Sequence, residues 1–314
     1  MRLLRFAFFK DADAPRASIF YQTELIGRIR MTMDIESLRQ WVGKTESRTD
    51  QVTAAPMMGL SATLDRDDAA PQPGDALPPL WHWLYFLPIA RQAELSEDGH
   101  ASRGGFLPPV PLPRRMWAGS RFQFHRPLRV GDTVCRSSAI TDVSLKDGRT
   151  GPLVFVTAQH KISDAHGIAI EEEQNLVYRE KPKADSPLPP PKLAPGGSDW
   201  QRTIYPDPVL LFRYSALTFN GHRIHYDRPY ATEVEGYPGL IVHGPLLATL
   251  LLDLVRRNLP DASVSGFFFR AVRPLFDTGS FSVCGRVEAD QRHVELWAQS
   301  EEGWLAMEAT AALR

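Results

Sequence analysis

A proline-rich segment near the middle of the chain limits the fold more than any other feature, because it divides the sequence into two parts. Residues 181–197 hold six prolines and end in paired glycines. Proline lacks a backbone donor and favours extended geometry, so we expect a linker over residues 181–200. The linker separates residues 31–180 from residues 201–314, and the similar patterns of these two parts indicate a duplicated fold.

Each part combines helical periodicity with alternating strands that are separated by glycine-containing turns. In the first part, the pattern predicts helices at 35–42 and 54–64, an apolar block at 77–89, and strands at 116–125, 133–143, 153–163 and 168–178. In the second part, a segment at 208–219 leads to a histidine cluster, and the pattern predicts one apolar helix at 244–257 and strands at 263–274, 280–289, 293–299 and 304–312. A long helix before four or five antiparallel strands is typical of a hotdog domain, in which a sheet wraps around a central helix.

The composition is that of an ordinary globular protein. The 314 residues are 43% hydrophobic and carry a formal net charge of -1, which argues against a broad nucleic-acid surface. The two cysteines, Cys135 and Cys284, form neither a zinc motif nor a disulfide framework, so we expect buried thiols and a cytoplasmic location. No apolar run approaches the roughly 18 residues of a membrane helix, so we expect no membrane span.

Residues 1–30 form an extension that we expect to add little to the core. The segment opens like a weak targeting signal, but Lys10, Asp11 and Asp13 end its apolar stretch early. A helix start follows directly after Met31 and Met33, which favours translation from one of these methionines.

A cluster of histidines stands beside the long apolar helix of the second part. His222 and His225 lie within a few residues of the carboxamide of Asn220, and His243 directly precedes Gly244, where the helix is expected to begin. Folding alone explains such a cluster poorly, so it is the first candidate for chemistry.

These residues resemble the signature of the MaoC-type hydratase 2 family, which runs Ser-Gly-Asp-x-Asn-Pro-x-His and then Pro-x-x-His-Gly. Residues 218–225 and 239–244 match this pattern. In that family an aspartate and a histidine activate the water that adds across a thioester-conjugated double bond. The resemblance implies that His225 is the catalytic histidine, whereas Asn220 stands in place of the acid. An amide orients water but cannot accept a proton, so we expect His225 to do most of the acid–base work.

The same resemblance suggests roles for the neighbouring residues. The backbone N–H of Gly244, at the positive end of the helix, is expected to stabilise negative charge on a thioester carbonyl. His222 occupies the second asparagine of the signature and is a candidate both for substrate binding and for holding the loop. His243 is a further binding candidate, although a scaffold role is favoured for it.

The first part resembles the partner domain of two-hotdog hydratases and of the fungal fatty-acid-synthase dehydratase module. It lacks an Asp-x-x-x-x-His pair, so we expect a degenerate hotdog that shapes the pocket of a catalytic second hotdog. Residues 77–86 and 105–117 resemble the mesaconyl-C4-CoA and itaconyl-CoA hydratase branch. The implied protein is an α+β double hotdog that hydrates a dicarboxylic enoyl-CoA such as itaconyl-CoA or mesaconyl-C4-CoA to citramalyl-CoA.

A substrate with a free carboxylate requires a planar cation, and Arg223, Arg114 and Arg115 lie in the segments that carry the resemblance. Arg270 is the candidate for the phosphates of coenzyme A, among several arginines of the second part. Trp81 is either a core residue or an aromatic lid over the acyl group. No spacing typical of a metal site or a nucleotide loop occurs, so we expect neither a metal nor a dissociable cofactor.

Two other functions stay open from the sequence. A 3-hydroxyacyl-thioester dehydratase of fatty-acid metabolism would have a long apolar pocket without a cation at its end. A non-catalytic acyl-CoA-binding hotdog protein is consistent with the amide at Asn220. In every case we expect an acyl-CoA thioester as the ligand and either a double-hotdog monomer or a homodimer.

Overall fold

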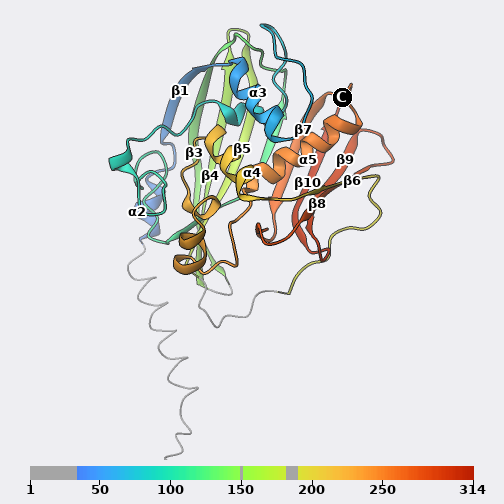
Figure 1. The fold of residues 1–314 in the computed structure, drawn as a ribbon. Helices are drawn as coiled ribbons and strands as arrows, with labels where there is room; N and C mark the ends of the chain where they lie inside the picture. Colours follow the sequence, from blue (N-terminus) through green and yellow to red (C-terminus); the bar gives the residue numbers. More distant parts are fainter. Residues whose placement is uncertain (1–33, 149–150, 182–189) are drawn as a thin grey trace, which may run out of the picture.

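The computed structural model describes residues 34–148, 151–181 and 190–314, so the expected extension at 1–30 and part of the linker lie outside the described residues. In this part of the chain, ten strands form one antiparallel sheet (Figure 1). The strands are β1 (Thr45–Gln51), β2 (Arg114–Phe124), β3 (Thr133–Gly148), β4 (Gly151–Asp164), β5 (Gly167–Arg179), β6 (Trp200–Ile204), β7 (Val264–Ala271), β8 (Phe281–Val287), β9 (His293–Ser300) and β10 (Leu305–Leu313).

The strand order repeats in the two halves of the sheet. The first half runs β1-β3-β4-β5-β2 and the second runs β6-β8-β9-β10-β7, and the halves join where β2 pairs with β7. At this junction a Cβ on Gly119 would lie 2.4 Å from the carbonyl oxygen of Phe269, so only glycine allows the two strands to approach so closely. The repeated order is that of a double hotdog, as the sequence predicts.

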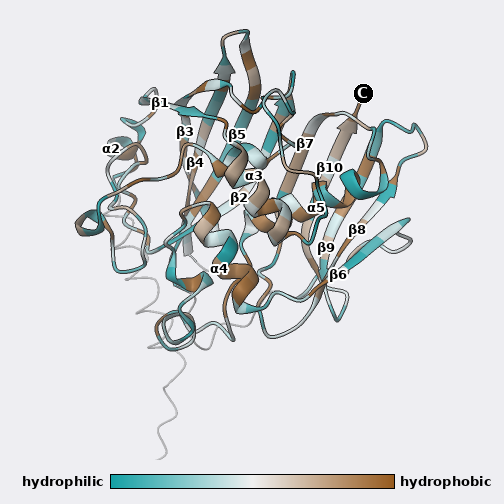
Figure 2. Ribbon diagram, turned by 45° about the horizontal axis from the view of Figure 1, so that its top comes forward, coloured by the Kyte–Doolittle hydropathy of each residue, from teal (hydrophilic) through white to brown (hydrophobic). Residues whose placement is uncertain are grey.

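The helices lie on one face of the sheet (Figure 1). They are α2 (Ile35–Arg39), α3 (Ala54–Thr63), α4 (Pro208–Leu217) and α5 (Gly244–Asn258). The central helix of the second half is α5, whose residues 246–255 are all buried and which packs on β6, β8, β9 and β10. Figure 2 shows hydrophobic residues on the helix turns and strands that face each other.

The described part of the first half has no helix as long as α5. Its longest helix is α3, with 10 residues, which packs against α4 through Gly59 and Leu217. Residues 77–113, which precede β2 as α5 precedes β7, form loops and the short 3-10 helices η1 (Trp81–Leu84) and η2 (Gln92–Glu94). This segment contains seven prolines, and proline interrupts a helix by removing a donor and by steric clash.

The eight strands that the sequence predicts are all present, but β1 and β6 were not predicted. Both are strands at the edges of the sheet. β1 is polar throughout, and its residues alternate between exposed and half-buried positions. β6 has only 5 residues and follows directly after the proline-rich segment. Neither strand has the hydrophobic alternation by which a strand is recognised in a sequence.

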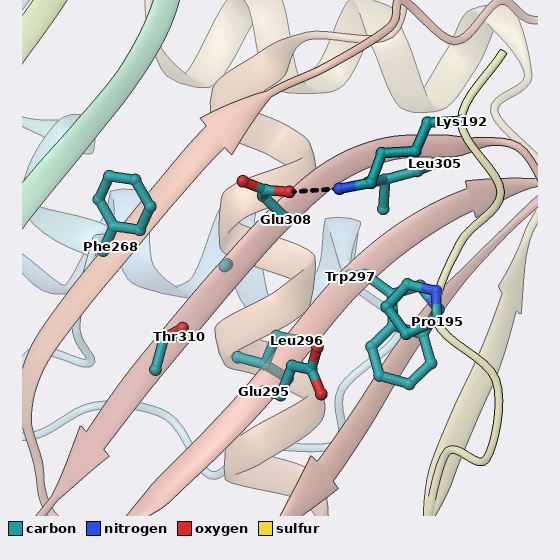
Figure 3. A pocket seen from close by; sticks show the side chains of 10 residues that line it. Lys192, Pro195, Phe268, Glu295, Leu296, Trp297, Leu305, Glu308 and Thr310 are labelled. Carbon is teal, nitrogen blue, oxygen red and sulfur yellow. Dashed lines mark hydrogen bonds and ion pairs between the residues drawn. The ribbon is translucent and has the colours of Figure 1, made fainter.

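Residues 190–197, after the undescribed part of the linker, pack against the second half of the sheet. The backbone N–H of Leu305 donates to the carbonyl oxygen of Lys192 at 2.8 Å, and the Lys192 ammonium pairs with Glu308 at 3.4 Å (Figure 3). Pro195 lies beside the indole of Trp297, which is 1% exposed, and the two residues line a cavity of about 190 Å³ (Figure 3). The end of the linker therefore covers a large apolar side chain.

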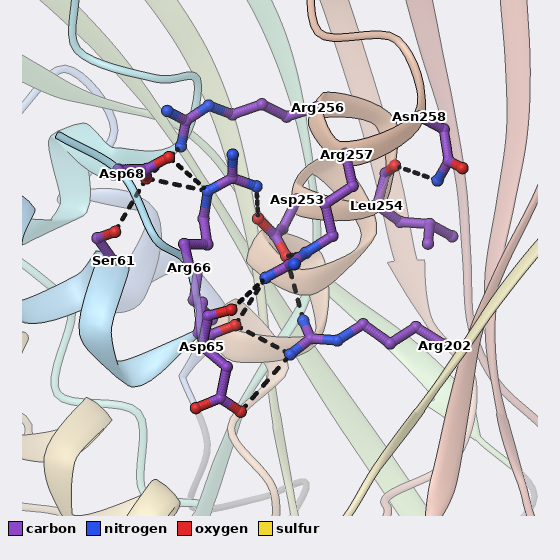
Figure 4. Close-up of polar contacts among 11 residues, drawn as sticks. Ser61, Asp65, Arg66, Asp68, Arg202, Asp253, Leu254, Arg256, Arg257 and Asn258 are labelled. Carbon is purple, nitrogen blue, oxygen red and sulfur yellow. Dashed lines mark hydrogen bonds and ion pairs between the residues drawn. The ribbon is translucent and has the colours of Figure 1, made fainter.

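A buried carboxylate connects the two halves. Asp253 on α5 is 1% exposed and pairs with Arg66 at 2.8 Å, with Arg257 at 2.7 Å and with Arg202 at 3.2 Å (Figure 4). Arg66 follows α3 in the first half, whereas Arg202 belongs to β6. A charge inside a protein is tolerated only when it is paired, so these contacts fix α3, β6 and α5 relative to one another.

None of the helices in the described ranges combines the length and the apolar content that crossing a membrane requires.

Replacing Asp253 by asparagine should destabilise the fold strongly. We expect Asp253→Asn to lower the free energy of unfolding by about 3 kcal/mol, because it removes the buried charge that Arg66, Arg202 and Arg257 share. Chemical denaturation followed by circular dichroism measures the change. Asp65→Asn is the matched control, because the Asp65 side chain is 90% exposed and lies 3.8 Å from Arg202, and it should cost less than about 0.5 kcal/mol. Equal losses in the two variants would contradict the role of Asp253.

Candidate active site

Residues 218–243, between α4 and α5, form a segment that we call the histidine loop. Near its start the Asn220 carboxamide oxygen accepts a hydrogen bond from the backbone N–H of His222 at 3.0 Å. Asparagine commonly closes a turn in this way. The turn leads into the 3-10 helix η3 (Arg223–His225), so Asn220 shapes the loop that presents the histidines.

His225 is held in one tautomer. Its Nδ1 lies 2.8 Å from the carbonyl oxygen of Ile241, and because a carbonyl only accepts, Nδ1 carries the proton. Nε2 therefore has the lone pair. Some side-chain nitrogens of the described residues are fully buried and have no hydrogen-bond partner, but the Nε2 of His225 is not one of them. Burial lowers the pKa of His225 to about 4, although the hydrogen bond to Ile241 opposes this shift. The ring is thus a neutral base at physiological pH.

His243 supports His225 from behind. The two rings stack with centroids 3.7 Å apart and an interplanar angle of 18°. His243 is 0% exposed, and its Nε2 lies 2.8 Å from the hydroxyl oxygen of Ser215 on α4. Burial holds the pKa of His243 well below its usual value. This ring contacts His225 and Ser215 rather than open space, so it positions the base.

Two further imidazoles lie beside this pair. The ring of His222 lies 5.5 Å from that of His225 and 4.0 Å from that of His100. The His100 Nδ1 donates to the Asp98 carboxylate at 2.9 Å. We call His100, His222, His225 and His243 the imidazole row. Burial lowers the pKa of His100 and of His222, so both rings favour the neutral form.

His100 and Asp98 come from the first half and were not identified from the sequence. The hairpin at residues 95–101 brings them to the histidine loop, where the backbone N–H of Arg223 donates to the Asp98 carbonyl oxygen at 2.9 Å. Gly99 faces Gly221 so closely that a Cβ on Gly99 would lie 1.9 Å from the Gly221 carbonyl oxygen. The Asp-Gly dipeptide indicates a turn in the sequence, but nothing there indicates which part of the chain the turn contacts.

Gly244 is the first residue of α5 and directly follows His243. A Cβ added at Gly244 would have nothing within 4 Å, so the space in front of this residue is open. Within the described ranges, the Gly244 N–H has no hydrogen-bond acceptor, as is usual for the first N–H groups of a helix. An anionic oxygen in front of Gly244 would meet this donor and the positive end of the helix dipole.

Two of the predicted arginines are already engaged with carboxylates. Arg223 pairs with Asp227 at 2.7 Å and lies over the Tyr230 ring at 4.1 Å. Arg114 is buried and pairs with Glu235 at 3.0 Å. The structure therefore places both guanidinium groups in contacts that stabilise the fold around the site.

Arg115 is different, because none of the described carboxylates pairs with it. It is half-buried at the start of β2, opposite Tyr178 on β5, and it donates a hydrogen bond to the Tyr178 hydroxyl. After burial, the positive charge of Arg115 contributes to the lowered pKa of His100 and of His222. Of the predicted arginines, Arg115 is therefore the one whose charge acts on the imidazole row and is not paired with a carboxylate of the described residues.

Arg270 and Trp81 lie away from the imidazole row. Arg270 on β7 is 55% exposed and pairs with Glu308 at 2.7 Å. Trp81 is 4% exposed, belongs to the core, and lines a cavity of about 500 Å³ beside α3. Arg256 of the last turn of α5 lies 5.4 Å from the centre of its ring, so Trp81 is at the opposite end of α5 from Gly244.

Within the described ranges, two groups of side chains have metal ligands within 4.8 Å of one another. They are the group of Asp98, His100 and His222 and the exposed group of Glu288, Asp290 and His293. In the first group the His100 Nδ1 and the Asp98 carboxylate already bond to each other, and the positive charges of Arg115 and Arg103 act on His100. Acid–base chemistry fits these surroundings better than cation binding does.

Comparisons with known proteins agree with this arrangement. A family profile described as "Hydroxyacyl-thioester dehydratase type 2" matches residues 80–277. A mesaconyl-C(4)-CoA hydratase of Chloroflexus aurantiacus is 50% identical over 274 residues, which are 87% of this chain and 96% of the relative. The mitochondrial hydroxyacyl-thioester dehydratase type 2 of Schizosaccharomyces pombe is 31% identical over 247 residues, 71% of this chain and 80% of the relative. A Mycobacterium tuberculosis protein described as a double hotdog fold superposes with a TM-score of 0.53 at 15% identity, over 87% of this chain and 96% of that one.

The glycine contact between the hairpin and the histidine loop can be tested by adding one methyl group. Gly99 has a φ of 87° and Gly74 has a φ of 90°, but a Cβ on Gly74 would have nothing within 4 Å. Gly74→Ala therefore reports the left-handed strain alone, about 1 kcal/mol. We expect Gly99→Ala to cost about 1–3 kcal/mol more, because the methyl group meets a backbone oxygen that no side-chain rotation can move. Chemical denaturation of both variants measures the difference, and equal costs would contradict the contact.

Proposed function

Since the chain belongs to the hydroxyacyl-thioester dehydratase type 2 family, we propose that it is a hydro-lyase that adds water reversibly to a short, branched, dicarboxylic enoyl-CoA. The proposed substrates are mesaconyl-C4-CoA and itaconyl-CoA, and the product is citramalyl-CoA. The observation that carries the proposal is the neutral ring of His225, which keeps its lone pair on Nε2 and stacks on His243 at the start of α5. The 50% identity to a mesaconyl-C(4)-CoA hydratase supports this choice of substrate.

His225 acts as the general base on water in this proposal. Its Nε2 accepts a proton from the water as the water oxygen bonds to the β-carbon of the enoyl group. The hydrogen bond from Nδ1 to Ile241 keeps the lone pair on Nε2, and the stack with His243 limits rotation of the ring. Both contacts hold the base in one orientation before the substrate arrives.

Gly244 supplies the second requirement, a donor for the charge that develops on the thioester. As water adds, the electrons of the double bond move toward the carbonyl oxygen, which becomes an enolate oxygen. In the proposal, the N–H of Gly244, which has no acceptor within the described residues, donates to this oxygen. A donor of this kind contributes about 3 kcal/mol in comparable oxyanion sites.

Asn220 keeps a supporting role in this scheme. Its carboxamide oxygen is used by the His222 N–H, so its NH₂ group is the part that remains to contact water. An amide cannot take up a proton, and the proposal therefore gives Asn220 no share in proton transfer. The proposed reaction also needs no metal and no cofactor besides the coenzyme A of the substrate.

Arg115 is proposed to bind the free carboxylate of the substrate. Arg114 and Arg223 pair with carboxylates of the protein, so binding the substrate through either one would break an existing ion pair. Arg115 has no such pair within the described ranges and acts electrostatically on the imidazole row. Its planar guanidinium can meet a carboxylate through two hydrogen bonds. The proposed binding roles of Arg270 and Trp81 have no comparable support.

A second candidate function is supported by the Schizosaccharomyces pombe relative. A 3-hydroxyacyl-thioester dehydratase would use the same base and the same oxyanion donor in the reverse direction, with a substrate that lacks the second carboxylate. The two functions differ in the group that the site binds beyond the double bond.

The experiment that tests the function is a substrate panel of mesaconyl-C4-CoA, itaconyl-CoA and crotonyl-CoA, followed by the loss of enoyl-thioester absorbance. We expect turnover of the dicarboxylic substrates, and we expect His225→Ala to lower kcat by about 10²–10⁴-fold, as is typical for the loss of a general base. His166→Ala, at an exposed turn between β4 and β5, is the control that keeps full rate. Turnover of crotonyl-CoA alone would favour the dehydratase, and a fully active His225→Ala would overturn the mechanism.

Arg115 should control the choice of substrate. We expect Arg115→Gln to lower the ratio of kcat/KM for mesaconyl-C4-CoA to that for crotonyl-CoA by about 10–100-fold, because a charge-assisted hydrogen bond is lost. Arg121→Gln is the matched control on the same strand, because Arg121 is exposed and lies over Phe268 at 5.1 Å. An unchanged ratio in Arg115→Gln would contradict the assignment of the carboxylate site.

A further inference from the structure

Hydration of an enoyl thioester requires two proton transfers, and in the histidine loop His225 has the geometry for one of them. Water loses a proton as its oxygen bonds to the β-carbon, and the α-carbon gains one. His225 has the geometry for the first transfer. Asn220 stands where the related signature has an acid, and its amide cannot carry a proton. A second proton carrier has to be another imidazole near the site or His225 itself.

The first half places a carboxylate–imidazole pair at the end of the imidazole row. The Asp98 carboxylate accepts from the His100 Nδ1 at 2.9 Å, so His100 presents its Nε2 on the opposite side of the ring. One nitrogen of His100, one nitrogen of His222 and a carboxylate oxygen of Asp98 all lie within 4.8 Å of one another. Asp98 and His100 are 29% and 23% exposed, so they lie nearer to solvent than His225, which is 7% exposed.

The position of this pair is fixed by the backbone. The hairpin at 95–101 is closed by a bridge between Leu95 and Ala101, and its tip presses Gly99 against Gly221. Two hydrogen bonds from Arg223, one from its N–H and one from its guanidinium, reach carbonyl oxygens of the same tip. His100 is thus held against the histidine loop by contacts that do not depend on its own side chain.

We propose that His100, oriented by Asp98, is the second acid–base group of the site and exchanges a proton with the α-carbon, while His225 exchanges one with water. This inference rests on the proposed hydration. It gives the first half a direct part in the chemistry, in place of a purely pocket-shaping role.

The steps balance as follows. The water oxygen forms a bond to the β-carbon and gives its proton to the His225 Nε2, and the electrons of the double bond pass through the α-carbon to the thioester oxygen. The proton on His225 passes through His222, which lies beside both rings, to the Nε2 of His100. The α-carbon then takes this proton from His100, and the thioester carbonyl forms again. One water is added, and no proton is gained or lost.

The surroundings of His100 keep the ring neutral at rest but let it take up a proton. Burial, which is the largest effect, and the charges of Arg115 and Arg103 favour the neutral ring, whereas Asp98 favours the protonated one. Burial raises the pKa of Asp98, yet the hydrogen bond to His100 outweighs this effect and leaves the carboxyl ionised. His100 is the member of the row that hydrogen-bonds a carboxylate, so it is the ring best able to carry the proton during turnover.

The test compares His100→Ala and His100→Gln with the wild-type protein on mesaconyl-C4-CoA. We expect kcat to fall by about 100-fold or more in both variants, as is typical for the loss of a general acid, with KM changed by less than about threefold. Added imidazole should restore His100→Ala by at least about tenfold, because the free base can enter the space that the ring leaves and carry the proton. Asp98→Asn should lower kcat by about tenfold or more, since it removes the charge that stabilises the imidazolium.

The matched control is a carboxylate–imidazole pair on the surface. Asp290 and His293 lie 2.6 Å apart and are 46% and 44% exposed, and we expect Asp290→Asn and His293→Ala to keep full rate. A wild-type protein that hydrates no enoyl-CoA would overturn the proposed function itself. An active wild type with an inactive His225→Ala but a His100→Ala within about threefold of full rate would overturn this inference alone. Loss of rate in both His100 variants without rescue by imidazole would also overturn it, because it would show a structural role.

Discussion

The hydrogen bond from the His225 Nδ1 to the Ile241 carbonyl is the contact on which the proposed chemistry depends. It assigns the proton of a buried ring to one nitrogen and leaves the lone pair on the other. The bond spans the histidine loop, from η3 to the residues just before α5, so the fold of the loop and the state of the base are linked. The bridge between Ile241 and Phe276 keeps this acceptor in place.

The two halves of the sheet have the same strand order but supply different groups to the proposed site. The second half keeps the long helix, and with it the histidine loop and the open N–H of Gly244. The first half has a proline-rich segment in the corresponding position, which cannot form such a helix but can supply a hairpin with an irregular path. That hairpin carries Asp98 and His100, and β2 begins close by with Arg115.

Much of this could be predicted from the sequence, and what could not has a physical cause. Hydrophobic alternation indicated eight strands, but the polar edge strand β1 has no such pattern. The motif identified His225 and Gly244 as candidates because they lie on one short stretch of chain. His100 lies 122 positions before His222, and only the folded hairpin joins them. Arg114 and Arg115 are neighbours of the same type, and their difference depends on Glu235, a partner that a sequence does not reveal.

The meeting of Gly99 and Gly221 has a consequence for how the site responds to heat. Most contacts between parts of a protein are made by side chains, which change rotamers as the temperature rises. Here two backbone segments contact each other directly, and such a contact involves no side chain that could change its rotamer. The distance between the hairpin at 95–101 and the histidine loop should therefore change little on warming while the fold is intact.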